Sequence, residues 1–235
     1  MNWPHGYRLI RLAEVDSTNS EAARRAGAGE RGPVWITADR QTQARGRRGR
    51  VWEQPSGNLA ATLLIHPTGD FAQLSFAAAL AVADMAQYLA PSTPISVKWP
   101  NDVLAHGEKL AGILLESGPG WLAIGIGVNL AGHPQGTEFP ATSLAGLGLT
   151  PPPPDQALSL LADGFARWYD VWMNEGFEPL RTAWLARASG LGAPIRARLP
   201  HETRHGVFAG LDASGALLLD EQGDVRAITA GEVFF

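Results

Sequence analysis

The sequence predicts an α+β fold, in which a mixed, largely antiparallel sheet with helices is followed by a small β module. Three observations support this class. Strand and helix patterns alternate near the N-terminus, strands joined by tight turns fill the middle, and the C-terminal part contains only short strands. With 235 residues, the chain suits one large domain or one domain with a small appendage, at about 150 residues per domain.

The N-terminal part reads as strand, helix, strand. Residues 8–15 and 34–38 have strand patterns, and the segment 18–21, Thr-Asn-Ser-Glu, forms a capping box that predicts a helix through about residue 26. Residues 59–65 follow as an apolar strand. An Ala-rich, mostly buried helix is expected over residues 71–89, where apolar side chains recur at helical spacing.

The middle of the chain changes to a meander. Strands are expected at residues 96–98, 103–105, 110–116 and 121–130, separated by His-Gly-Glu and Ser-Gly-Pro-Gly turns. Because the connections are so short, neighbouring strands must run antiparallel.

A four-proline connector at residues 151–154 precedes the last third of the chain. Asp155 is expected to cap a helix with buried Leu and aromatic side chains, and a second helix is expected over residues 178–188. Short strands then follow at residues 195–199, 207–211, 216–219 and 225–229. They predict a small β-barrel-like module, so the chain is expected to divide at about Ser189 into domains of residues 1–189 and 190–235.

Composition limits the chemistry and the location. The net charge is −4 and there is no cysteine, which excludes disulfides, thiolate metal sites and cysteine nucleophiles. The apolar stretch between Asp70 and Asp84 is shorter than the roughly 18 residues of a membrane span, and the first residues do not resemble a secretory signal. A cytoplasmic protein without a membrane partner is expected.

The densest chemical signal is the hexapeptide Arg45-Gly46-Arg47-Arg48-Gly49-Arg50. Four guanidinium groups on a glycine-rich loop suit phosphate or carboxylate oxygens, because the planar fork binds oxyanions and glycine allows close backbone approach. An ordinary solvated basic loop fits the pattern equally well. A nucleic-acid clamp is a third interpretation, which the acidic remainder of the chain weakens.

A second signal comes from two lysines near strand ends. Lys98-Trp99-Pro100-Asn101-Asp102 is followed by Lys109 at the start of an apolar strand, where its ammonium group suits a carboxylate or phosphate. Asn101 and Asp102 fit a simple turn, and Asp102 alternatively fits a Mg²⁺ ligand that bridges a nucleotide.

Two other motifs occur but do not fit the chemistry that they suggest. Gly125-Ile126-Gly127 lacks the third glycine of a dinucleotide fingerprint and lies along a strand, where glycine lets a ligand approach the backbone. The segment 201–205, His-Glu-Thr-Arg-His, matches a zinc-protease pattern, but that chemistry needs a helix and strands flank it. Neither a nucleophile elbow nor a phosphate-binding P-loop pattern occurs.

Taken together, the motifs resemble those of biotin protein ligases from about residue 10 to residue 130. The resemblance rests on Asp16-Ser17-Thr18-Asn19, Gln41-Thr42, the basic hexapeptide with Trp52, the two lysine motifs and Gly125-Ile126-Gly127-Val128-Asn129, in the family's order. The tail around residues 215–219 is similar to the family's small C-terminal domain. The resemblance implies a class II synthetase-like ligase domain and an SH3-like β-barrel.

The resemblance also implies an activity. Biotin and ATP with Mg²⁺ would give biotinyl-5′-adenylate and pyrophosphate, and the biotinyl group would pass to a lysine of a biotin carboxyl carrier protein of acetyl-CoA carboxylase or a related carboxylase. Two anions meet in the first step, so fixed positive charge matters more than a protein nucleophile. A homodimer is left open, and no DNA partner is expected because the motifs begin within about twenty residues of Met1.

Residue roles follow from the resemblance. Biotin-binding residues would be Ser17, Thr18, Asn19, Gln41, Arg45, Gly46, Arg47, Lys109, Gly112, Gly125 and Gly127, the glycines leaving room for the ligand's chain. ATP-binding residues would be Arg48, Arg50, Trp52, Asn101 and Asn129. Lys109, Arg45, Arg47 and Asp102 would be catalytic, with Asp102 also a Mg²⁺ ligand or the base for the transfer step.

One position departs from the family's pattern. Ala44 stands where the family usually has glycine before the first arginine of the loop, and alanine restricts φ. The nearest alternative function is a lipoate or octanoate ligase of the same superfamily, for which a different basic motif is expected.

Overall fold

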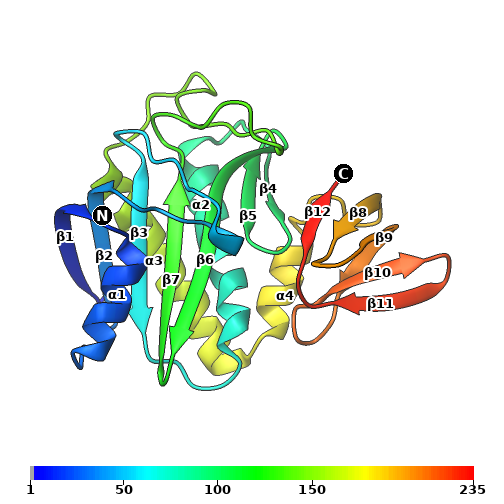
Figure 1. Ribbon diagram of the computed structural model, residues 1–235, viewed down its shortest axis with the longest axis horizontal. Coiled ribbons are helices and arrows are strands. Elements are labelled where there is room, and N and C mark those ends of the chain that lie inside the picture. The colour runs from blue at the N-terminus through cyan, green and yellow to red at the C-terminus, as the bar shows by residue number, and fades with distance from the viewer. Residues whose placement is uncertain (1–2) are drawn as a thin grey trace.

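A seven-stranded sheet forms the centre of the protein. The computed structural model describes residues 3–235 and gives the strand order β1-β2-β3-β7-β6-β5-β4 (Figure 1). The strands are β1 Arg8–Val15, β2 Val34–Gln41, β3 Leu59–Ile65, β4 Ile95–Lys98, β5 Asp102–Ala105, β6 Glu108–Gly118 and β7 Trp121–Val128. Only β1 and β2 run parallel, so the predicted mixed and largely antiparallel sheet is confirmed.

Helices cover the two faces of this sheet unequally. The helix α1 Thr18–Gly27 packs on one face, against β2, β3, β6 and β7. On the other face lie α2 Leu74–Leu89, α3 Pro154–Glu175 and α4 Glu178–Leu185. Side chains of β2 alternate accordingly: Trp35 joins the large core under α2 and α3, while Val34 and Ile36 join a small cluster under α1.

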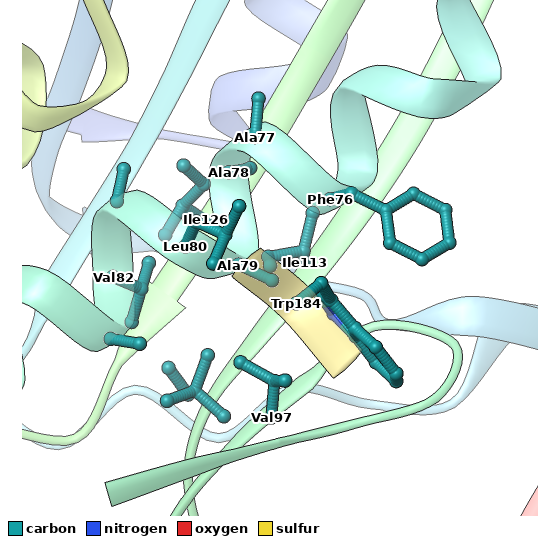
Figure 2. Packing of buried hydrophobic residues seen from close by; sticks show 14 of the residues in the cluster. Phe76, Ala77, Ala78, Ala79, Leu80, Val82, Val97, Ile113, Ile126 and Trp184 are labelled. Atoms are coloured by element: carbon teal, nitrogen blue, oxygen red, sulfur yellow. The ribbon is translucent and has the colours of Figure 1, made fainter. Parts of the chain in front are cut away.

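The helix α2 is buried on nearly all sides, as its composition predicts. Ala79 and Leu80 lie beside the sheet side chains Ile113 and Ile126, and Phe76 meets the α4 residue Trp184 edge to face (Figure 2). Its alanines allow close approach of α3, where a Cβ added at Gly164 would lie 3.6 Å from Ala81. With α2 and α3 filling this face, a ligand cavity on the sheet can form only on the face shared with α1.

A second sheet follows α4. It has five antiparallel strands in the order β11-β10-β9-β8-β12, namely β8 Pro194–Arg198, β9 Thr203–Leu211, β10 Leu217–Glu221, β11 Asp224–Ile228 and β12 Glu232–Phe234. Its core continues that of the large sheet, since Phe208 of β9 meets Trp184 of α4 edge to face, with ring centroids 6.4 Å apart, and both belong to the same buried cluster. Among the described residues the pairing does not show closure into a barrel.

Two expected helix caps are wrong. The capping box predicts Thr18 as the N-cap of α1, but the N-cap is Ser17, which makes no side-chain cap hydrogen bond. The Thr18 hydroxyl donates to Gln41 instead, and Glu21 accepts from Arg25. Asp155 lies inside the first turn of α3 and pairs with Arg11 of β1. Pro154 begins that helix, where a missing N–H costs nothing. In both cases a tertiary partner takes the side chain that local capping rules assign to the backbone.

Of the described helices, none combines the length and the apolar character needed to cross a membrane.

Candidate active site

A cavity of about 350 Å³ lies on the α1 face of the large sheet. It is bordered by the start of α1, the segment between β2 and β3, the strands β5 to β7 and the end of β12. The structure brings sixteen predicted site residues to its wall: Ser17, Thr18, Asn19, Gln41, Arg45, Gly46, Arg47, Arg50, Trp52, Asn101, Asp102, Lys109, Gly112, Gly125, Gly127 and Asn129. Arg48 is the exception, and its guanidinium faces Glu232 at 3.8 Å.

One end of the cavity is polar and uncharged. Ser17, Thr18 and Asn19 are buried at the start of α1. Gln41 Oε1 accepts hydrogen bonds from the Thr18 backbone N–H at 2.8 Å and from the Thr18 hydroxyl at 3.2 Å. Below them the fully buried Thr62 hydroxyl donates to Asn19 Oδ1 at 2.7 Å. These bonds fix the donors and acceptors of a site suited to a neutral hydrogen-bonding group.

Three of the glycines in β6 and β7 make room for side chains. A Cβ at Gly125 would collide with Asn19, and one at Gly127 would lie 2.5 Å from the Trp52 ring. A Cβ at Gly112 would lie 3.1 Å from the same ring. The space was expected to hold the ligand's chain directly. It holds Trp52 and Asn19 instead, and these two side chains form part of the cavity wall.

The other end of the cavity is cationic. Asp102 lies between two lysines, with Lys109 Nζ 2.6 Å from Oδ1 and Lys98 Nζ 3.4 Å from Oδ2. Lys98 is buried, and its ammonium lies 4.1 Å from the centre of the Phe139 ring. Burial lowers the pKa of Lys98, while Asp102 opposes that shift. Two ammonium groups on one carboxylate leave a net positive charge here.

This donor set does not fit a resident Mg²⁺. Both oxygens of Asp102 face ammonium groups, which would repel a cation. In the described part of the chain, no three His, Asp or Glu side chains gather as a metal site. The expectation of Asp102 as a metal ligand therefore gains no support from the geometry. The segment 201–205 is a loop and strand rather than a helix, so it also lacks the geometry of the zinc-protease motif.

The basic loop, residues 44–52, is folded against both sheets. Arg45 bonds to Glu116 of β6, and Arg47 donates to Gly231 O at 3.2 Å and Asn101 Oδ1 at 3.4 Å. Burial, and then the charge of Arg48, lowers the pKa of Arg47. Only Arg48 and Gly49 adopt the left-handed region within this loop. Ala44 does not, so alanine at that position carries no backbone strain in this conformation.

The last strand supplies cavity residues that local sequence patterns do not indicate. Glu232 and Phe234 of β12 line the cavity. Glu232 pairs with Arg50 at 2.7 Å and with Arg198, which also binds Glu138 at 2.7 Å. Burial alone would raise the pKa of Glu232, but hydrogen bonds from Arg198 and Arg50 lower it to about 2. The small sheet therefore holds the basic loop through a charged carboxylate.

Two asparagines fix the backbone around the cavity. Asn101 Nδ2 donates to Ile113 O at 2.6 Å, which ties the turn before β5 to β6. Asn129 is buried, and its Nδ2 donates to Thr142 O at 3.0 Å. Both side chains thus shape the wall by holding loops. The turn interpretation of Asn101 and its place in the cavity are compatible, because one side chain does both.

The arrangement suits an elongated substrate with a neutral polar head and an anionic end. The head would lie near Thr18 and Gln41, and the anionic end near Lys109 and Arg47. A second anion would meet the first there, because fixed cations reduce the repulsion between them.

Comparison with known proteins points the same way. Residues 3–131 match the biotin/lipoate A/B protein ligase family, and residues 190–235 match the biotin protein ligase C-terminal domain. A biotin–[acetyl-CoA-carboxylase] ligase of Paracoccus denitrificans is 48% identical, over 95% of this chain and 99% of that protein. The Mycobacterium tuberculosis ligase of that name is 33% identical, over 97% and 89%.

Solved structures give a matching likeness. A biotin protein ligase from Aquifex aeolicus in complex with biotin and ATP superposes with a TM-score of 0.86, at 27% identity and over 97% of each chain.

Proposed function

Because this chain belongs to the biotin/lipoate A/B protein ligase family, we propose that the cavity described above is the site where it activates biotin. The protein is a biotin protein ligase: it activates biotin with ATP to biotinyl-5′-adenylate and transfers the biotinyl group to a carboxylase. The observation that carries the assignment to this cavity is its division into a neutral polar end and a cationic end.

The polar end accounts for recognition of the ureido head. Thr18 and Gln41 are already joined by hydrogen bonds, and Gln54 Oε1 accepts from Gln41 Nε2 at 3.0 Å. The amide orientation of Gln41 is thereby set before ligand arrives. Ser17 and Asn19 complete this end, and a preset pocket loses less entropy on binding.

The cationic end accounts for activation. The biotin carboxylate must approach the α-phosphate of ATP, so an oxygen–phosphorus bond forms while pyrophosphate leaves. Lys109 would lie between the two anions and stabilise the charge that develops on the phosphate oxygens. Asp102 and Lys98 would orient Lys109, and Arg47 adds a cation that has no carboxylate partner among the described residues.

Mg²⁺ belongs to the substrate in this proposal. It would arrive with ATP, held by the phosphates and water, since Mg²⁺ commonly keeps several waters and needs few protein ligands. Trp52, Asn129 and Arg50 would border the nucleotide. For the transfer step, the carrier lysine must attack as a neutral amine. Asp102 already pairs with two ammonium groups, so its role would be to orient Lys109 rather than to take that proton.

We also propose a carrier protein, a domain boundary and a location for this enzyme. The carrier would be a biotin carboxyl carrier domain of acetyl-CoA carboxylase or a related carboxylase, and the chain would divide at about Ser189. A cytoplasmic location is supported by the use of ATP. Light scattering at micromolar concentration would test whether the protein forms a homodimer. No DNA partner is proposed, because two arginines of the basic loop, Arg45 and Arg50, already pair with Glu116 and Glu232.

ATP–pyrophosphate exchange with biotin and lipoate, compared side by side, tests the proposed function. Exchange that depends on biotin and not on lipoate is expected, because the polar end presents donors and acceptors that a dithiolane ring cannot use. Exchange driven by lipoate alone would instead identify a lipoate ligase.

A further inference from the structure

Glu116 is a carboxylate beside the cavity that no sequence motif indicated. It lies on β6 opposite Ala123 of β7 and does not itself line the cavity. Its oxygens accept three hydrogen bonds: from Arg45 Nε at 3.1 Å, from Arg45 Nη2 at 2.9 Å and from Asn19 Nδ2 at 2.8 Å. One side chain thus joins the basic loop to the start of α1.

The bond to Arg45 is made by one edge of the guanidinium. Nε and Nη2 grip the two carboxylate oxygens, and Nη1 donates to the Ser20 hydroxyl at 2.9 Å. A guanidinium has five N–H donors, so one on Nη1 and one on Nη2 remain. Arg45 lines the cavity, where these remaining donors can meet a ligand. Glu116 therefore selects which edge of Arg45 is left for a ligand.

The bond to Asn19 settles a second orientation. A carboxylate only accepts hydrogen bonds, so Asn19 must present its NH₂ group to Glu116. Its Oδ1 then faces the Thr62 hydroxyl, which donates to it. With this amide turned around, Oδ1 would face the carboxylate and the hydrogen bond to Glu116 would be lost. Asn19 is also the side chain for which Gly125 leaves space.

A simpler interpretation of the Arg45–Glu116 contact is an exposed ion pair that only stabilises the fold. Such pairs contribute little, since water and salt screen them. Two features distinguish Glu116 from the surface pair of Glu14 and Arg40: its bidentate geometry and its third partner at the polar end of the cavity. Side chains of Arg45 and Glu116 are each about one third exposed, against 71% and 53% in the Arg40–Glu14 pair.

We propose that Glu116 is a positioning residue for biotin activation, holding Arg45 and Asn19 in the orientations that receive biotin. This inference rests on the proposed function. It acts on the biotin end, whereas the ATP side of the loop is held by Glu232 through Arg50. The two carboxylates thus divide the loop between the two substrates.

The test is Glu116→Gln, assayed by biotin-dependent ATP–pyrophosphate exchange, with Glu14→Gln as the matched control. The amide cannot accept from both arms of the fork, so the KM for biotin is expected to rise about tenfold or more, the loss typical of a hydrogen bond to a charged group. The KM for ATP and the Tm should stay close to those of the unchanged protein. Glu14→Gln should leave both KM values unchanged.

A double-mutant cycle with Arg45→Gln identifies the route of the effect. If Glu116 acts largely through Arg45, adding Glu116→Gln to Arg45→Gln should raise the KM for biotin much less than it does alone. Fully additive losses, equal rises in both KM values or an unchanged KM for biotin would overturn the proposal. If Glu116→Gln does not fold, Glu116→Asp must show the same selective rise, because its shorter side chain cannot span all three partners.

Different results would refute the proposed function and the positioning role of Glu116. Exchange by the unchanged protein that does not depend on biotin would refute the proposed function. Normal biotin-dependent exchange with an unaffected Glu116→Gln variant refutes only the positioning role.

Discussion

Lys109 concentrates the chemistry of the site in one side chain. Replacing it with alanine is expected to reduce adenylate formation by about 10²- to 10³-fold, as for loss of a single donor to a developing oxyanion. The fold should persist, because Asp102 keeps Lys98 as a partner. Biotin-dependent ATP–pyrophosphate exchange measures the loss, and circular dichroism checks the fold. Near-normal exchange would contradict a role for Lys109 at the reacting groups.

Gly127 is a residue whose role depends on the absence of a side chain. In Gly127→Ala the new methyl group would lie 2.5 Å from the Trp52 ring and would push the indole into the cavity. Trp52 borders the proposed nucleotide site, so the KM for ATP is expected to rise. The rise should be about tenfold if moving the indole costs about 1.4 kcal/mol of binding free energy. Steady-state kinetics at saturating biotin measures this.

The matched control for that change is Gly27→Ala at the end of α1. No atom lies within 4 Å of its added Cβ, and its φ is outside the left-handed region. Unchanged kinetics and equal or slightly higher stability are expected there. If Gly127→Ala and Gly27→Ala have the same kinetics, the space needed by Trp52 is not the reason for glycine at position 127.

Among the elements, β12 of the second sheet holds the basic loop, which lies between β2 and β3 of the large sheet. The pKa of Glu232 is lowered from 4.5 to about 2, so its ion pairs stabilise the fold at pH values above the unfolded-state pKa. That contribution is lost as the pH falls from about 4.5 toward 2. At about 1.4 kcal/mol per pKa unit, a shift of this size corresponds to roughly 3.5 kcal/mol at most, and solvent screening of the partly exposed arginines reduces the contribution.

Urea unfolding of the unchanged protein and Glu232→Gln at pH 5.5 and pH 3 measures this contribution. The difference in free energy of unfolding should be largest at pH 5.5 and should shrink at pH 3. A difference that does not depend on pH would show that the carboxylate charge is not what holds the loop.

Local patterns predicted most elements correctly because each element carries its own periodicity. The strands β1, β3, β6 and β7 and the helices α2 and α3 lie close to their expected positions. Caps were wrong at Thr18 and Asp155, where partners distant in the chain take the side chains. The strand β12 was not expected, since three residues beside β8 are too few for a recognisable pattern.

At the scale of the whole molecule, the distribution of lysine stands out. Lys98 and Lys109 are the only lysines in the sequence, and all other cationic side chains except histidine are arginine. Lys98 is buried and Lys109 is paired with Asp102. Biotinyl-5′-adenylate reacts with neutral amines, and a guanidinium stays protonated. The side chains of the protein are therefore expected to resist acylation by its own intermediate.

Peptide mass mapping after incubation with biotin, ATP and Mg²⁺, without a carrier, checks this expectation. No biotinylated side chain should be found in the unchanged protein. Arg40→Lys and Arg167→Lys place an amine at exposed positions and should each gain a biotinyl group there. Unmodified lysines in both variants would mean that the intermediate does not reach the surface.

Local sequence patterns are enough to predict the fold class, the order of the motifs and the family. In the structure, sixteen of the seventeen predicted site residues meet in one cavity. These features are encoded locally, by periodicity and by short motifs. Tertiary structure alone decided what holds those residues. Glu116 lies 71 positions from Arg45, and Glu232 lies 182 positions from Arg50. Contacts at such separations arise only when the strands pair, so no local pattern records them.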